Sequence, residues 1–314
     1  SVEAGGINNV AIGDNAGTAI TTGDCNVAVG KDALTTNSTG TRNTAIGQGA
    51  LTANTTADNN TAVGKNSMVA NTEGHSNVAV GANALDANTT GDNNTAIGMD
   101  ALTANTTANQ NTAVGDEALK LNTTGDCNTA VGKGSLDTNT TGTRNVAVGG
   151  EALGANTTAS FNNALGYKAL CSNTTGASNI SIGTCSMRIN TTGANNVAVG
   201  DKALCANTTA SNNTAVGNAA LCLNTTGTDN IAMGSCTLDA NTTGNSNTAI
   251  GRLSLTANTT GSNNSAVGAG SLLTNTTGDS NVAFGVSSLR LNTTGDFNTG
   301  IGLCSIYTNT TGGC

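Results

Sequence analysis

The chain has 314 residues but contains no proline, no tryptophan, three phenylalanines and two tyrosines, which excludes the aromatic-rich core of an ordinary globular domain. The net charge of −8, with only 11 Lys and Arg residues scattered along the chain, argues against a nucleic-acid partner. No run approaches the roughly 18 apolar residues of a membrane-spanning helix, so we expect no membrane insertion.

The first predicted element is a short lead-in, residues 1–8, which has the composition of part of a repeat. Residues 9–314 then form eighteen consecutive 17-residue repeats with no gap or insertion. Every repeat has Asn at position one, from Asn9 to Asn298, and Gly at position five, from Gly13 to Gly302. The consensus is N-[TV]-A-[VI]-G-x-x-[AS]-L-x-x-N-T-T-G-x-x, and such a strict period predicts a repeat architecture.

Each repeat contains two short apolar clusters, for example residues 44–46 and 50–51, separated by Gly and Asn turns. Seventeen residues with such breaks leave no room for a helix, so the pattern predicts two short strands per repeat. The few apolar side chains of one repeat do not offset the entropy of ordering it, so each repeat needs its neighbours. We therefore predict an all-β protein, a parallel β-solenoid (β-roll) of eighteen 17-residue rungs that form one solenoid.

The apolar residues at positions four and nine are expected to point inward, one from each strand. Position three is Ala in sixteen repeats, the exceptions being Ser181 and Gly300. If positions two and four face the core, this row of small side chains forms a flat outer strip on which another chain can dock. In the alternative interpretation the rung is thin and the Ala faces the opposite wall inside the core.

The string Asn9-Val10-Ala11-Ile12-Gly13 recurs as residues 26–30 and 77–81 with Val at the fourth position. It resembles the S-V-A-I-G core of the head repeats of YadA-like trimeric autotransporter adhesins, and related repeats occur in phage tail fibres. The resemblance covers the first five positions and the small residue at position eight, and this chain departs from it in period and in its N-T-T-G extension. The resemblance implies a parallel β-roll, an exported surface role and binding to a host surface.

Asn residues at positions one and twelve would stack from rung to rung, and their amides could form hydrogen-bonded ladders along the axis. Position twelve also opens an N-x-S/T sequon in sixteen repeats, which permits N-glycosylation and a sugar-coated fibre as a second interpretation. The candidate glycosylation sites are Asn37, Asn54, Asn88, Asn105, Asn122, Asn139, Asn156, Asn173, Asn190, Asn207, Asn224, Asn241, Asn258, Asn275, Asn292 and Asn309.

The nine cysteines occupy only three positions of the repeat. Cys171, Cys205 and Cys222 lie at position ten, Cys185, Cys236 and Cys304 at position seven, and Cys25, Cys127 and Cys314 at position seventeen. The pairs Cys171/Cys185 and Cys222/Cys236 have the same spacing and register, which favours two disulfides between adjacent rungs in an oxidising compartment. Small buried thiols are the alternative interpretation.

Catalytic and cofactor-binding patterns are not found in the sequence. A catalytic triad would depend on His75, the only histidine, and the acidic residues do not recur at a fixed position as repeated calcium sites require. No C-x-x-C occurs, so a metal site is not expected either. We predict a protein that is not an enzyme and that has no cofactor.

The last repeat completes all seventeen positions, and solenoids normally end in atypical capping repeats. In one interpretation the chain is a fragment of something longer. In the other, copies stack end to end or associate laterally, with Cys25 and Cys314 close to neighbouring chains. The leading functional hypothesis is therefore an extracellular structural protein, a subunit of a surface fibre. The alternatives are an adhesin head or tail-fibre shaft at a cell or virion surface, with glycans or a host surface as partners. An ice-binding solenoid that uses the Thr rows is a further alternative.

Overall fold

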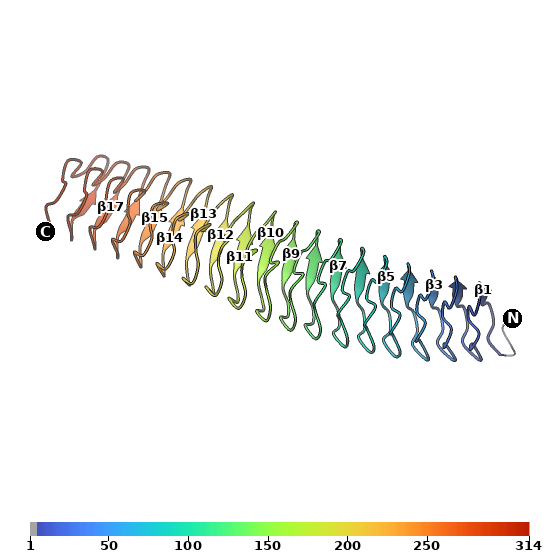
Figure 1. Cartoon of the computed structure of the whole chain (residues 1–314). Helices are drawn as coiled ribbons and strands as arrows, with labels where there is room; N and C mark the ends of the chain where they lie inside the picture. The colour runs from blue at the N-terminus through green and yellow to red at the C-terminus, as the bar shows by residue number, and fades with distance from the viewer. Residues whose placement is uncertain (1–4, 314) are drawn as a thin grey trace. The chain divides into compact units, whose positions relative to one another are not determined.

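The computed structural model describes residues 5–313, and the part of the chain it describes contains strands and turns but no helix. Each 17-residue repeat forms one rung with one three-residue strand (Figure 1). The strands are β1 Val10–Ile12, β2 Val27–Val29, β3 Thr44–Ile46, β4 Thr61–Val63, β5 Val78–Val80, β6 Thr95–Ile97, β7 Thr112–Val114, β8 Thr129–Val131, β9 Val146–Val148, β10 Asn163–Leu165, β11 Ile180–Ile182, β12 Val197–Val199, β13 Thr214–Val216, β14 Ile231–Met233, β15 Thr248–Ile250, β16 Ser265–Val267, β17 Val282–Phe284 and β18 Thr299–Ile301.

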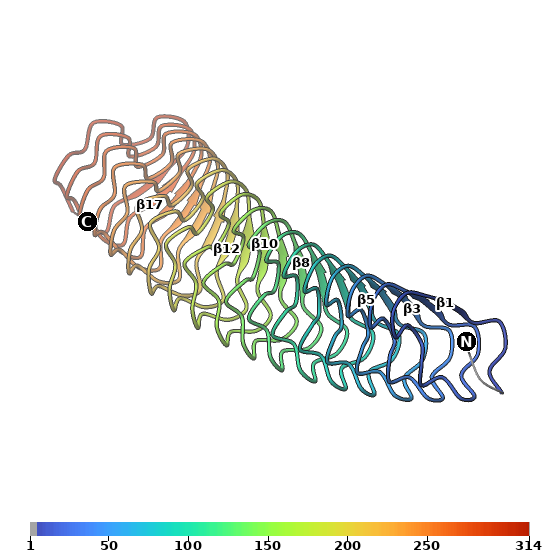
Figure 2. The ribbon, with the colours of Figure 1, turned by 45° about the vertical axis from the view of Figure 1, so that its right-hand side comes forward.

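Two compact units divide the chain, Ser1–Ser160 with β1 to β9 and Phe161–Cys314 with β10 to β18. In each unit the strands pair in parallel with a register of one repeat, so that Val27 of β2 lies beside Thr44 of β3. Figure 2 shows the turns that return the chain from each strand to the next rung. The prediction of an all-β, parallel β-solenoid with 17-residue rungs is confirmed.

The second apolar cluster of each repeat lies in turns, so the prediction of a second strand is wrong. In the sixth rung, Ala101 N donates to Gly98 O at 3.4 Å and Asn105 N to Leu102 O at 3.2 Å, which closes two consecutive tight turns. The backbone is left-handed at Asp100 (φ 54°) and Leu102 (φ 56°), and the same conformation recurs at positions seven and nine of the other rungs. Backbone bonds between rungs continue through the turns, as from Leu102 N to Ala118 O at 3.0 Å.

The core of a rung consists of small side chains and one larger one. In the sixth rung Ala96 at position three, Ala101 at position eight and Leu102 at position nine are completely buried. Ile97 at position four is 40% exposed, so the expectation that position four points inward is wrong and the thin-rung interpretation of the Ala row is correct. The physical reason is that successive strand residues alternate between faces, and beside the position-nine leucine the interior accommodates only a methyl group.

Two rows of buried asparagines run along each unit, as the ladder interpretation predicted. Asn94 N donates to Asn77 Oδ1 of the preceding rung at 2.8 Å, while Asn94 Nδ2 donates to Ala108 O at 2.8 Å. Asn105 Nδ2 donates to Asn88 Oδ1 at 2.9 Å and also to Ala108 O at 3.1 Å. In this rung both asparagines thus donate a hydrogen bond to the carbonyl oxygen at position fifteen. Each is also hydrogen-bonded to the asparagine at the same position of the preceding rung.

Candidate assembly surface and side-chain clusters

The strand face, formed by positions two and four of all eighteen repeats, points outward. Position four is apolar in every repeat, and position two carries Val, Ile, Thr, Ser or Asn, so no charged residue lies on this face. The residues at position four that count among the exposed large hydrophobics are Ile12, Ile46, Val80, Ile97, Val148, Leu165, Ile182, Met233, Ile250, Phe284 and Ile301. At position four each unit therefore presents a continuous apolar row, whereas single exposed apolar side chains would be ordinary.

The asparagines of the candidate glycosylation sites lie inside the rungs. Those from Asn37 to Asn292 are completely buried, and Asn309 is half-buried. Their Nδ2 atoms, to which an N-linked glycan would be attached, donate hydrogen bonds within the ladder, as in Asn122 Nδ2 to Asn105 Oδ1 at 3.1 Å. Glycosylation stays a prediction, but a glycan at such a residue would have to replace a buried amide hydrogen bond.

The two threonine rows that follow differ in their environment. Thr123 Oγ1, at position thirteen, donates to Thr140 O of the next rung at 3.0 Å, and the same bond recurs along most rungs. The hydroxyls of position thirteen are thus engaged by the backbone. The position-fourteen residues, such as Thr107 and Thr124, are exposed and lie in a turn.

All eight cysteines in residues 5–313 are free thiols, and Cys314 lies outside the described residues. Cys25 is exposed, whereas Cys171, Cys185, Cys222 and Cys236 are half-buried. The register explains why the predicted pairs are not direct neighbours. Positions seven and ten stack on the same positions of the next rung, so Arg188 follows Cys171 and Cys222 follows Cys205.

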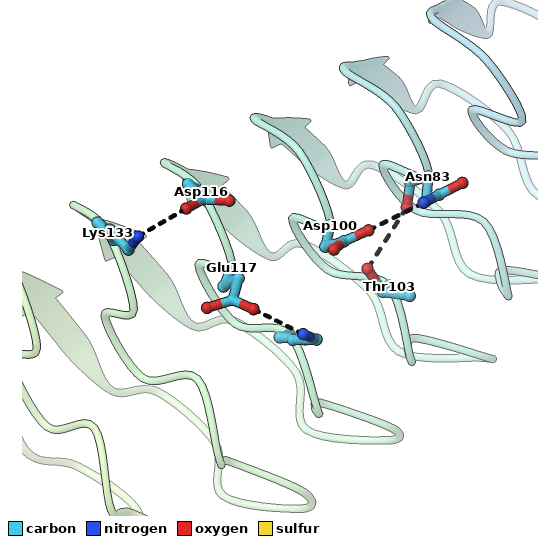
Figure 3. A network of polar contacts seen from close by, with 7 residues as sticks. Asn83, Asp100, Thr103, Asp116, Glu117 and Lys133 are labelled. Carbon is cyan, nitrogen blue, oxygen red and sulfur yellow. Dashed lines mark hydrogen bonds and ion pairs between the residues drawn. The ribbon is translucent and has the colours of Figure 1, made fainter.

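Charged side chains gather at positions six, seven and ten of the sixth to eighth rungs (Figure 3). Asn83 Nδ2 donates to Asp100 Oδ1 at 3.0 Å, and Lys133 Nζ lies 3.1 Å from Asp116 Oδ2. Lys120 Nζ lies 2.7 Å from Glu117 Oε1, and this hydrogen bond raises the pKa of Lys120. Sequence reasoning missed the cluster because its members differ in residue type from repeat to repeat and come together only through the rung register.

Burial also raises the pKa of three carboxyl groups at position ten, those of Asp86, Asp137 and Asp239. Asp137 receives additional repulsion from Glu117 and Glu151. Within residues 5–313, His, Cys, Asp and Glu side chains form no group of three or more that could hold a metal ion. In the same range no helix is long and apolar enough to cross a bilayer.

Comparison with known protein families and with characterised proteins finds no match to this chain. The family resemblance of the repeat core therefore supports an expectation about function but assigns no activity.

Proposed function

We propose that the chain is a non-enzymatic structural protein, a subunit of an extracellular fibre whose copies associate through the strand face. The observation that supports the proposal is the continuous apolar row at position four, beside a position two that is never charged. Removing such a row from water stabilises association in proportion to the apolar area buried.

A second copy of the chain is the occupant that fits this face best. Every rung presents an apolar side chain at position four, so the rows of two copies share one repeat distance and can match over many rungs. A net charge of −8 opposes close approach of copies in general, but the charged residues lie away from the strand face. Stacking of terminal rungs through the bonds that join successive rungs would extend such an assembly into a fibre.

The proposed assembly does not include glycans, because the Asn amides to which they would be attached donate the buried ladder hydrogen bonds. Disulfides are likewise not part of the proposed assembly, because the cysteines of residues 5–313 are free thiols. Attachment to a host surface, as the resemblance implies, would add a ligand to this assembly and is not needed for it.

The proposal is tested by placing charge on the strand face. A triple variant with Lys in place of Ile97, Val114 and Val131 introduces three like charges at position four of consecutive rungs. We expect it to remain monomeric in sedimentation velocity runs at concentrations where the wild-type chain forms large species.

The matched control carries Lys in place of Thr107, Thr124 and Thr141, which adds the same charge to the exposed position-fourteen row. We expect the control to associate as the wild type does, with both variants retaining the wild-type circular dichroism spectrum. Equal association of the wild type and of both variants would refute the strand face as the contact surface.

A further inference from the structure

Two cysteines lie at the same position of successive rungs in the unit Phe161–Cys314. Cys205 and Cys222 both occupy position ten, and Ala206 N donates to Cys222 O at 2.9 Å, which keeps these two segments in contact. The strands of the same rungs, β12 and β13, pair in parallel with Val197 beside Thr214. Stacked residues of parallel strands are about 4.8 Å apart, and a disulfide requires Cα atoms about 4.4–6.8 Å apart.

Positively charged side chains lie near the Cys205 thiol, as they do at reactive cysteines. Arg188, Cys205 and Cys222 occupy position ten of three successive rungs, and the backbone joins these segments through Ile189 N to Cys205 O at 3.4 Å and Ala206 N to Cys222 O at 2.9 Å. The register therefore places the Arg188 guanidinium and the Cys222 thiol on either side of Cys205. Lys202, three residues before Cys205, adds a second positive charge. Both thiols are only half-buried, so a small molecule can reach them.

The surroundings shift the pKa values of the two thiols in opposite directions. The neighbouring Cys222 thiol, together with the positive charges of Arg188 and Lys202, lowers the pKa of Cys205 to about 6. The pKa of Cys222 is raised by the adjacent Cys205 thiolate and by partial burial. At neutral pH Cys205 is thus a thiolate beside a protonated partner, an arrangement that supports thiol–disulfide exchange.

We propose that Cys205 and Cys222 form a thiol–disulfide exchange site that takes low-molecular-weight disulfides as substrates and closes a disulfide between successive rungs. The Cys205 thiolate attacks one sulfur of the small disulfide, and the other sulfur leaves as a thiolate. Cys222 then loses its proton and attacks the Cys205 sulfur, releasing the second small thiolate. The protein gives up two electrons and two protons, and the small disulfide becomes two thiols.

The test uses the fully reduced chain and glutathione disulfide at neutral pH. After the remaining thiols are alkylated, cleavage before aspartate yields a peptide of residues 201–228, which contains only these two cysteines. We expect this peptide to escape alkylation and to be two hydrogen atoms lighter than its reduced form. This change should precede any reaction of Cys171 or Cys185. Failure of the peptide to oxidise while other cysteines do would overturn the proposal.

Three variants distinguish exchange from simple proximity. Cys222→Ser should stop at the mixed disulfide on Cys205, and Arg188→Gln should shift the pH midpoint of Cys205 alkylation from about 6 toward the ordinary value of about 8.5. Cys127→Ser, which removes an exposed thiol in the other unit, should leave the oxidation rate unchanged. A pH profile of Cys205 alkylation that coincides with that of Cys127 would contradict the assigned role.

Discussion

At the residue scale, the glycine at position five is required by the approach of successive rungs. Gly115 has a φ of +141°, and a Cβ atom built on it would lie 2.6 Å from the carbonyl oxygen of Gly132. Real Cβ atoms do not approach a backbone oxygen this closely, and L-residues rarely adopt this φ. The spacing between rungs therefore depends on the absence of a side chain at this position.

Replacing Gly115 with Ala should lower the free energy of unfolding by about 3 kcal/mol or more, because backbone strain and steric overlap add. Gly134→Ala is the matched control, since Gly134 is left-handed (φ +59°) but has open space around it. Gly134→Ala should lower the free energy of unfolding by about 1 kcal/mol. Urea denaturation of both variants measures the difference, and equal costs would show that the close approach is unimportant.

Asp137 provides a pH-dependent prediction. Burial raises the pKa of its carboxyl group in the folded chain, so the folded state binds more protons than the unfolded state while pH lies between the two pKa values. Stability consequently falls as pH rises through this window. Asp137→Asn should raise the urea midpoint at pH 7 and give no gain near pH 3, where both states are protonated. A gain of equal size at both pH values would rule out ionisation as the cause.

At the element scale, the asparagine ladder takes the place of a large hydrophobic core. Asn105 donates to Asn88 Oδ1 and Ala108 O and accepts from Asn122 Nδ2, all within the buried interior. Removing its side chain leaves several buried polar groups without that partner, and each such group costs about 1–3 kcal/mol. The ladder thus joins each rung to both neighbours.

Asn105→Ala should reduce the free energy of unfolding by roughly 2–4 kcal/mol. Thr107→Ala, two residues later in an exposed turn, should change it by less than about 0.5 kcal/mol. Thermal unfolding followed by circular dichroism compares the two variants. A similar loss in both would indicate that the ladder adds little to stability.

Much of the element structure could be predicted from sequence, because the unbroken period fixes which residues stack. This register predicted the parallel strands and both asparagine ladders. The orientation of Val114 and Ala113 could not be predicted, since alternation places them on opposite faces but both are apolar. The left-handed backbone at Leu119 (φ 53°) was also missed, because a leucine strongly disfavours that conformation when considered alone.

The candidate sites were harder to predict than the fold. Asn83 and Asp100, Asp116 and Lys133, and Cys205 and Cys222 each lie seventeen residues apart, so only the three-dimensional register brings them together. Cys205 and Cys222 were assigned to one position of the repeat, yet the equal spacing of two other pairs favoured Cys171/Cys185 and Cys222/Cys236. Stacking in register, which matches each position with itself, gives the Cys205 and Cys222 contact directly.

At the scale of the whole molecule, each rung depends on its neighbours and presents the same outer face. Small buried side chains and amide ladders leave the larger apolar residues of the strands on the surface. In an ordinary globular domain most apolar strand residues of this size would lie in the core, as the position-nine leucines do here. It is the physical basis for proposing that association between copies buries the strand face.

Negative-stain electron microscopy of the purified wild-type chain, over a range of concentrations, tests this central claim most directly. We expect fibres many times longer than one chain, and we expect them to be absent from the variant with Lys in place of Ile97, Val114 and Val131. Discrete particles of single-chain size at every concentration would contradict this claim.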